Sequence, residues 1–321
     1  MIATLYRELE IENDLRKVRQ IMQDQIERST PFIRKSLRGL FEHSGKLLRP
    51  TLLLLASRFG DDDARGRHSL AAAVEMLHIA TLIHDDIIDQ APSRRGIPTL
   101  HSLYGSKKAV LIGDFLFSRS FKLAADHTDI ETGKYIAQVV GSICESELRQ
   151  HDSLSPSATG FKEYHRRIMG KTAALFAISA YIGARQSGAD DRTCGRLQKI
   201  GANIGAGFQI IDDILDFSSQ SGSTGKKAGA DIRQGIVNLP ILFALEKDDG
   251  RLEKQLLRRP NNGRRLKQAI TLTRELEGID KARSCAAAYT RKALESVDLL
   301  PDTVHRKRLE NFVSFLLKRE Y

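Results

Sequence analysis

Residues 67–90 read RHSLAAAVEMLHIATLIHDDIIDQ, and this stretch decides the fold class. Its apolar residues recur three or four positions apart, which is the period of an α-helix. Most of the chain carries the same period, whereas a convincing two-residue alternation typical of β-strands does not occur in the sequence. We therefore expect an all-α protein. The predicted helices span residues 4–28, 31–43, 46–59, 67–90, 107–126, 131–151, 161–186, 190–218, 235–247, 263–275, 279–296 and 302–319.

The breaks between these helices have the composition of turns, because Gly, Pro, Ser and Asp are concentrated in them. With 321 residues, the chain slightly exceeds the size at which single hydrophobic cores usually stop growing, so its length allows one large domain or two small ones. Since no long linker is evident, we expect residues 1–321 to form a single domain. The segment from Ser218 to Gly229 is rich in Ser and Gly, and we expect it to be a mobile loop.

The composition is that of an ordinary globular protein, with 41% hydrophobic and 28% charged residues, which excludes long disorder. The three cysteines, Cys144, Cys194 and Cys285, are widely spaced, so neither a disulfide framework nor a zinc site is indicated. Residues 1–20 contain no continuous apolar stretch of the length that a secretory signal requires. The longest aliphatic run, residues 52–56, is too short to span a bilayer. These features predict a cytoplasmic protein.

The formal net charge of +10 is compatible with three kinds of partner: nucleic acid, an anionic membrane surface, or a highly anionic substrate. Nucleic acid is disfavoured, because aromatic residues make up only 6%, tryptophan is absent and no nucleic-acid-binding motif occurs. No amphipathic anchor stands out in the sequence, so we expect at most peripheral membrane contact. The charge alone does not choose further.

Two acidic clusters with similar sequences, LIHDDIID at 82–89 and IIDDILD at 210–216, lie more than a hundred residues apart. We call Asp85, Asp86 and Asp89 the first aspartate cluster, and Asp212, Asp213 and Asp216 the second aspartate cluster. In each cluster the outer aspartates are four residues apart and so share one helix face. Like charges at this spacing destabilise an isolated helix by about 0.2–0.5 kcal/mol per pair. Because the flanking aliphatic residues indicate buried helices, a cation should offset the repulsion.

Carboxylates without a nearby set of Cys and His ligands suit hard divalent cations. Mg²⁺ in particular uses one or two carboxylates, several waters and the phosphate oxygens of a substrate. Either cluster alone could be a solvated acidic helix end, but two copies embedded in aliphatic helices favour a metal site. The sequence therefore predicts Mg²⁺ that bridges the protein to a phosphorylated ligand.

Basic residues of the kind that bind phosphate accompany the clusters. Arginine binds phosphate oxygens bidentately, and lysine acts as a point charge. The candidates are Lys46 and Arg49 in GKLLRP, Arg94 and Arg95 just after the first cluster, Lys171 in GKT, and Lys226 after Gly225. Any one of these could be a surface charge, but their occurrence together with the clusters indicates a diphosphate ligand.

Together these residues resemble the trans-isoprenyl diphosphate synthases, also called polyprenyl synthetases. The matching motifs are GKLLRP at 45–50, HDDIIDQAPSRRG at 84–96, GKT at 170–172, GFQIIDDILDF at 207–217 and GKKAGAD at 225–231. The resemblance runs from about Gly45 to Pro240. It implies a single large helical bundle of the isoprenoid synthase type with a central cavity, a homodimer, and a lid formed by residues 218–229.

The resemblance also implies an activity, namely the head-to-tail 1′-4 condensation of isopentenyl diphosphate with an allylic diphosphate such as farnesyl diphosphate. By resemblance, Asp85, Asp89 and Asp212 hold three Mg²⁺ ions on the allylic diphosphate, and Asp86, Asp213 and Asp216 support them directly or through water. Arg94, Lys171 and Lys226 contact that diphosphate, and Lys46, Arg49, His78 and Arg95 bind isopentenyl diphosphate. Thr172, Gln209 and a backbone carbonyl near Lys171 shield the allylic carbocation. Many relatives carry a further Lys where this chain has Ile236, so the allylic diphosphate is expected to be held more weakly or by other residues.

Product length is predicted from the residues that precede Asp85. Short-chain relatives place bulky aromatic residues four or five positions before this aspartate, whereas this chain has Ala80 and Thr81. An open tunnel and a product of hexaprenyl length or longer are therefore expected. In the alternative, Ala80 and Thr81 are simply helix-packing residues, and a deeper side chain such as Phe115 or Phe121 limits the product length. A short-chain farnesyl or geranylgeranyl diphosphate synthase is the alternative function.

Two other readings share parts of this pattern. A terpene cyclase usually has an Asn/Ser/Glu pattern at the second cluster, whereas this chain has Asp216 and Gln220 at the Ser/Thr and Glu places. A noncatalytic subunit of a heteromeric synthase typically lacks one or both clusters, and this chain keeps both. The chain could still require a partner subunit for activity.

Overall fold

The computed structural model describes residues 2–42, 45–60, 66–94, 96–152, 160–217, 228–256 and 263–317. Within these residues α-helices predominate, and the β-structure is limited to two antiparallel strands of two residues each, β1 (Ser93–Arg94) and β2 (Ile97–Pro98). The prediction of an all-α protein is therefore confirmed. No helix in this part of the chain is long and apolar enough to cross a membrane.

The chain divides into two compact units, and each is described by itself. Unit 1 comprises Met1–Gln138, Leu175–Gly201 and Ser296–Phe312, and unit 2 comprises Val139–Ala174, Ala202–Glu295 and Val313–Tyr321. The expected single domain with a central cavity stays a prediction.

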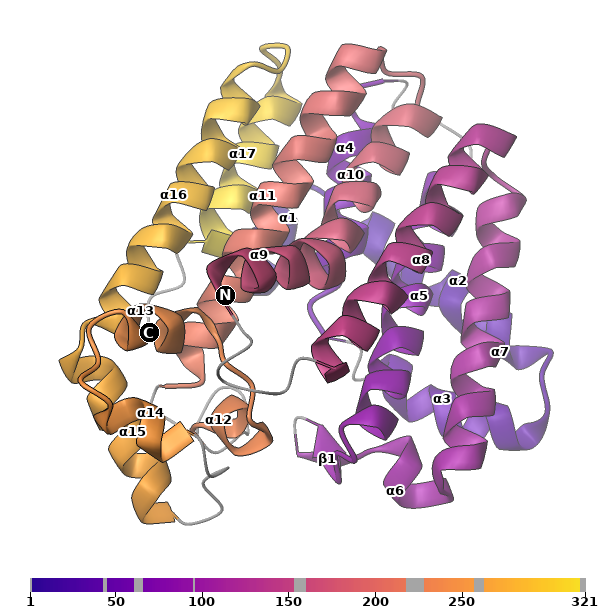
Figure 1. The fold of residues 1–321 in the computed structure, drawn as a ribbon. Helices are drawn as coiled ribbons and strands as arrows, with labels where there is room; N and C mark the ends of the chain where they lie inside the picture. Colours follow the sequence, from indigo (N-terminus) through magenta and orange to yellow (C-terminus); the bar gives the residue numbers. More distant parts are fainter. Residues whose placement is uncertain are drawn as a thin grey trace. The chain divides into compact units, whose positions relative to one another are not determined.

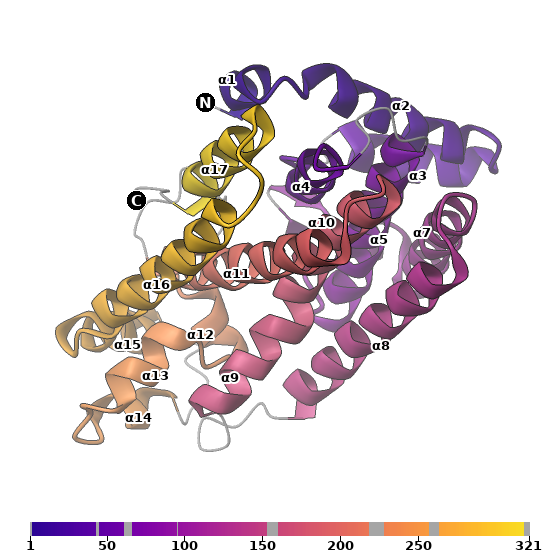
Figure 2. The same cartoon turned by 90° about the horizontal axis from the view of Figure 1, so that it is seen from above.

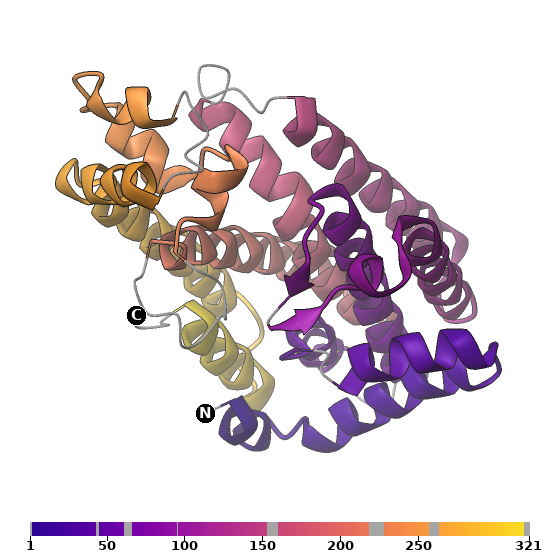
Figure 3. The same cartoon turned by 90° about the horizontal axis from the view of Figure 1, so that it is seen from below.

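Unit 1 is built around α5, which contacts α7 most extensively and also packs against α2 and α4 (Figure 1). Its helices are α1 (Ile2–Glu8), α2 (Glu12–Glu27), α3 (Pro31–Glu42), α4 (Leu48–Ser57), α5 (Arg67–Ile88), α6 (Leu100–Tyr104) and α7 (Ser106–Ala125), with parts of α8 (Ile130–Asp152), α10 (Ala174–Gln186), α11 (Asp191–Leu215), α16 (Gly278–Asp298) and α17 (Val304–Leu317). The leucines at 52–55 are at most 1% exposed, so α4 contributes all sides of its central turns to the core. The two short strands follow directly after α5 (Figure 3).

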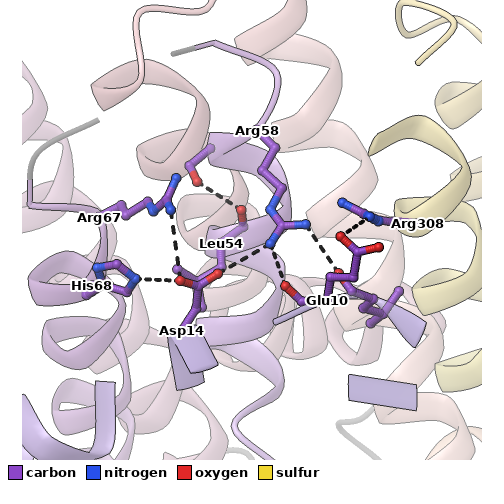
Figure 4. Close-up of polar contacts among 9 residues, drawn as sticks. Glu10, Asp14, Leu54, Arg58, Arg67, His68 and Arg308 are labelled. Carbon is purple, nitrogen blue, oxygen red and sulfur yellow. Dashed lines mark hydrogen bonds and ion pairs between the residues drawn. The ribbon is translucent and has the colours of Figure 1, made fainter. Parts of the chain in front are cut away.

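A polar cluster around Asp14 joins α2 to the end of α4 and the start of α5 (Figure 4). The Asp14 carboxylate accepts hydrogen bonds from Arg58 Nη2 at 3.3 Å and from His68 Nε2 at 2.7 Å, and Arg67 Nη2 lies 3.9 Å away. Burial raises the pKa of Asp14, but His68, Arg67 and Arg58 outweigh it, so the pKa lies below its usual value of 3.8. This carboxylate is thus stabilised in its charged form. It fixes α2 against the core of unit 1.

Unit 2 contains a group of short helices that pack on one another: α13 contacts α14 and α15, and α14 contacts α15 (Figure 2). Its elements are α9 (Phe161–Ile168), the π-helical turn η1 (Met169–Ala173), α12 (Ala230–Gln234), α13 (Leu239–Leu245), α14 (Arg251–Leu256) and α15 (Gly263–Glu275), with the remaining parts of α8, α10, α11, α16 and α17. Asn238 caps α13, because its side chain accepts a hydrogen bond from the backbone N–H of Ile241.

Several predicted helices are divided or shortened in the structure. The helix predicted at 4–28 is interrupted at Glu10, which adopts a positive φ of 54°. The helix predicted at 161–186 is interrupted by η1, whose wider hydrogen-bonded turn leaves the apolar period almost unchanged. The helix predicted at 235–247 begins only at Leu239, after Gly235 has adopted a positive φ of 80°.

Candidate active site

The first aspartate cluster lies at the carboxyl end of α5. Asp86 is 8% exposed, Asp85 is half-buried, and Asp89 is exposed and forms the C-cap of the helix. Since the carboxyl end of a helix carries partial negative charge, three carboxylates at this place are electrostatically unfavourable without cations. This position therefore favours cation binding.

One of the required cations comes from the chain itself. Arg94 in β1 donates from Nε to Asp86 Oδ1 at 2.8 Å, and its Nη2 lies 2.8 Å from the same oxygen. Thr99 holds the end of the two-stranded turn, because its hydroxyl donates to the carbonyl of Ala91 at 2.7 Å. Arg94, expected to contact diphosphate, is thus placed directly at the first cluster. Arg95 lies outside the described residues.

Three of the residues predicted to bind isopentenyl diphosphate are described, and these three belong to unit 1. Lys46 precedes α4 and is exposed, and the hydroxyl of Tyr6 donates to its backbone carbonyl. Arg49 on α4 is half-buried, with its guanidinium carbon 4.6 Å from the centre of the Phe176 ring. His78 is half-buried on α5, and this helix packs against α4.

The second aspartate cluster lies at the end of α11, and its three carboxylates have different surroundings. Asp212 is exposed, whereas Asp213 is 5% exposed. Asp213 accepts hydrogen bonds from the Tyr164 hydroxyl at 2.6 Å and from Gln209 Nε2 at 3.0 Å. Asp216 follows the helix and accepts hydrogen bonds from the backbone N–H groups of residues 230 and 231, at 2.9 and 3.1 Å. These bonds favour indirect support by Asp213 and Asp216.

The environment of Asp213 changes its ionisation strongly. Burial, followed by the charge of Asp231, raises the pKa of Asp213 from 3.8 to about 7, although the hydrogen bonds from Tyr164 and Gln209 act in the opposite direction. Burial also raises the pKa of the Tyr164 phenol well above its usual value, and the neighbouring Asp213 adds to this effect. Tyr164 is therefore a hydrogen-bond donor at neutral pH.

The GKT segment at 170–172 lies in the π-helical turn η1, a type of turn often found at functional sites. Lys171 Nζ lies 2.5 Å from Glu147 Oε1 on α8, and the Thr172 hydroxyl donates to Gln209 Oε1 on α11 at 2.7 Å. The Lys171–Glu147 contact depends on close packing at Gly170, where an added Cβ would lie 1.9 Å from Ser146 Oγ on α8.

Sequence reasoning missed two residues that contact these predicted site residues, Tyr164 and Glu147. Tyr164 lies seven residues before Lys171, so a shared helix face was a usable signal. Glu147 has no comparable signal, because only folding brings α8 beside η1. Lys226, the remaining predicted phosphate ligand, lies outside the described residues, as does the predicted lid apart from residues 228 and 229.

The carboxylates of the two clusters suit Mg²⁺, an ion that also takes water and substrate phosphate as ligands. Among the described residues, no three His, Cys, Asp or Glu side chains form a group that could hold a metal ion by themselves. Asp85, Asp89 and Asp212 are the less buried members of their clusters. Mg²⁺ characteristically takes one or two carboxylates and completes its shell with water and phosphate. The donor set therefore fits this ion.

Comparison with known proteins identifies the family. The sequence model named Polyprenyl synthetase matches residues 30–273. The chain belongs to this family. It is therefore a prenyltransferase, as the resemblance of its motifs implied.

Similar proteins cover nearly the whole chain. Solanesyl-diphosphate synthase 2, chloroplastic, from Oryza sativa is 34% identical over 315 residues, which are 96% of this chain and 78% of that protein. Heptaprenyl diphosphate synthase component 2 from Geobacillus stearothermophilus is 34% identical over 282 residues, 88% of each chain. Among solved structures, the polyprenyl synthase from Caulobacter crescentus, complexed with calcium and isoprenyl diphosphate, is 31% identical, with a TM-score of 0.93 and coverage of 100% of this chain and 98% of that chain.

Proposed function

We propose that this polyprenyl synthetase is a long-chain trans-polyprenyl diphosphate synthase, which condenses isopentenyl diphosphate with an allylic diphosphate and releases diphosphate. The observation that carries the proposal is the pair of aspartate clusters, each with one buried aspartate bonded to the chain and a less buried neighbour. The solanesyl and heptaprenyl names of two relatives support a long product.

The less buried aspartates are the proposed Mg²⁺ ligands. Asp85, Asp89 and Asp212 hold the ions, three in number, and Asp86, Asp213 and Asp216 act mainly by orienting their surroundings. Bound Mg²⁺ would supply positive charge that stabilises the departing diphosphate. The calcium in the Caulobacter crescentus structure supports a divalent-cation site in the family.

The basic residues divide between the two substrates. Arg94, Lys171 and Lys226 contact the allylic diphosphate, and Lys46, Arg49, His78 and Arg95 bind isopentenyl diphosphate. Lys171 is held by Glu147 in this structure, at 2.5 Å, so the lysine exchanges or shares this partner when diphosphate binds. Thr172 and Gln209 direct oxygen atoms toward the allylic carbon as positive charge develops on it.

Ala80 and Thr81 on α5 are the proposed determinants of product length. Ala80 is fully buried, whereas Thr81 is half-buried and its hydroxyl donates to the carbonyl of His78 at 2.7 Å. Thr81→Phe therefore adds bulk with less damage to packing than Ala80→Phe, and we expect it to shorten the product. Thr290→Phe is a matched control, because Thr290 is also half-buried and bonded to a carbonyl one turn earlier.

The deciding experiment is a condensation assay on the purified single chain with farnesyl diphosphate, radiolabelled isopentenyl diphosphate and Mg²⁺. Products of hexaprenyl length or longer support the proposal, and farnesyl or geranylgeranyl products would establish the short-chain alternative. Farnesyl diphosphate alone serves as the cyclase control, because release of hydrocarbon without isopentenyl diphosphate would contradict a synthase. Failure of the single chain to turn over would indicate a required partner.

Self-association is the proposed assembly. Val110, Leu111 and Phe121 on α7 are 39%, 67% and 39% exposed, an apolar surface that a second copy would cover. The words "component 2" in the name of one relative make a heteromeric partner the alternative occupant. Light scattering of the wild-type chain and of Leu111→Glu tests the proposal, since only the wild type should have the mass of a dimer.

A cytoplasmic location stays a prediction. One similar relative is named chloroplastic, so relatives of this chain do not all share one location.

A further inference from the structure

Four side chains of unit 2 form a continuous line of hydrogen bonds from α9 through α11 to η1. The Tyr164 hydroxyl donates to Asp213 Oδ2 at 2.6 Å, and Gln209 Nε2 donates to Asp213 Oδ1 at 3.0 Å. The Thr172 hydroxyl donates to Gln209 Oε1 at 2.7 Å. We call these residues the Tyr164–Thr172 chain.

The geometry gives the direction of every bond in this chain for the ionised form of Asp213. A carboxylate only accepts hydrogen bonds, so Gln209 turns its amino group toward Asp213. Its carbonyl oxygen then faces Thr172, which must donate its single hydroxyl proton to that oxygen. The outer side of the Thr172 oxygen is therefore left with lone pairs and no proton.

The packing keeps this arrangement in place. Tyr164 and Asp213 are 3% and 5% exposed, so water competes little for their hydrogen bonds. Gly205 lies one helical turn before Gln209, and a Cβ there would lie 2.5 Å from Ala173 Cα. The absence of a side chain at Gly205 thus allows α11 and η1 to approach closely enough for Gln209 to reach Thr172.

We propose that Tyr164 and Asp213 are positioning residues, which orient Gln209 and through it make Thr172 present an oxygen lone pair, and not its O–H, to the allylic carbon. This inference rests on the proposed function, in which Thr172 and Gln209 face the developing positive charge. An oxygen lone pair attracts that charge, whereas an O–H dipole pointing outward would repel it. The Tyr164–Thr172 chain thus determines whether the electrostatic field of Thr172 at the allylic carbon is attractive or repulsive to positive charge.

Tyr164→Phe tests the proposal by removing one hydroxyl and keeping the buried ring. Without this donor, only Gln209 among the described residues holds the Asp213 carboxylate by a hydrogen bond, so the carboxylate can rotate and no longer fixes the position of the Gln209 amide. We expect kcat to fall by about 10-fold to 100-fold, as when a residue that orients a ligand is removed. The KM values for both substrates and the Mg²⁺ dependence should stay within about twofold, because no diphosphate contact changes.

A binding measurement separates charge recognition from turnover. One probe is a farnesyl diphosphate analogue with an ammonium nitrogen at the position that becomes cationic, and the other is farnesyl thiolodiphosphate, which lacks that charge. Calorimetry with Mg²⁺ should show weaker binding of the ammonium probe to Tyr164→Phe by about tenfold, with unchanged binding of the thiolodiphosphate probe. Equal loss for both probes, or no loss for either, would overturn the proposal.

Tyr135→Phe is the matched control, because the Tyr135 hydroxyl also bonds to a glutamine, Gln198, outside the proposed site. Its affinity for both probes should equal that of the wild type, and a loss selective for the ammonium probe in this control would contradict the proposal. If Tyr164→Phe does not fold, Asp213→Asn provides the test, since an asparagine can donate to Gln209 and allow its amide to turn over. Failure of the wild type to bind either probe would instead contradict the proposed function.

Discussion

The two aspartate clusters are similar in sequence, but the chain compensates their buried carboxylates in different ways. Asp86 is paired with a cation, Arg94, whereas Asp213 is bonded by two neutral donors, Tyr164 and Gln209. The neutral donors do not offset the effect of burial, and the pKa of Asp213 is therefore raised to about 7. Two acidic motifs with similar sequences can therefore differ in their electrostatic surroundings, because residues outside each motif contact its buried aspartate.

The largest expected effect comes from the less buried aspartates, which should behave alike in both clusters. Asp85→Asn and Asp212→Asn should each lower kcat/KM by about 10³-fold, because each removes a proposed metal ligand. The Mg²⁺ concentration needed for half-maximal rate should rise in both. Steady-state kinetics over a Mg²⁺ series checks this, with Asp24→Asn on the exposed face of α2 as control. A normal rate in either variant would remove that cluster from the metal site.

A smaller effect is expected on the stability of the folded chain, which should depend on pH through Asp213 of the second aspartate cluster. The folded-state pKa of Asp213, about 7, lies above its usual 3.8, so the folded chain binds an extra proton between these values. Its contribution to stability is therefore fully present below pH 3.8 and is lost as the pH rises through 7. Thermal unfolding of the metal-free wild type and of Asp213→Asn at pH 5 to 8 should show that the wild type loses stability relative to the variant. A constant difference in Tm across this range would contradict the raised pKa.

Asp14 in unit 1 should show the opposite dependence of stability on pH. Because its folded-state pKa lies below 3.8, its contribution is present above pH 3.8 and is lost as the pH falls through the lower folded-state value. Asp14→Asn should therefore be less stable than the wild type at pH 7, and the difference should shrink in acid. Thermal unfolding between pH 2.5 and 7 measures it, and a difference that grew in acid would exclude this account of the Arg58, Arg67 and His68 contacts.

The smallest effect is expected from the ion pair of the first cluster. Arg94→Met leaves Asp86 without its cation, but Arg94 is 34% exposed on its side chain, so the loss should be only about 1–2 kcal/mol of unfolding free energy. Denaturant titration checks the value, and Arg94→Lys should restore part of it. A second effect of Arg94→Met, a higher KM for the allylic substrate, is expected only if Arg94 also contacts diphosphate.

The sequence was sufficient for the fold class, the positions of both clusters and the family, because helical period and motif spacing are local properties. It could not show that Asp213 is buried against Tyr164, since that contact joins residues 49 positions apart. The π-helical turn at Lys171 was missed for a related reason: a single wider turn hardly disturbs the apolar period. The short helix α14 was missed because six residues are too few to display a period.

Asp216 bonds to the chain on the far side of residues 218–227: its carboxylate accepts N–H groups of Ala230 and Asp231, and its backbone carbonyl accepts the N–H of Gly229. The two ends of that segment are therefore clasped by one residue of the second aspartate cluster. Loop-closure entropy grows slowly with length, so the intervening segment could be lengthened twofold at a cost of about 0.6 kcal/mol while this clasp persists. Replacing Asp216 would open the clasp as well as alter the acidic motif, whereas a longer segment that keeps Lys226 would leave both in place.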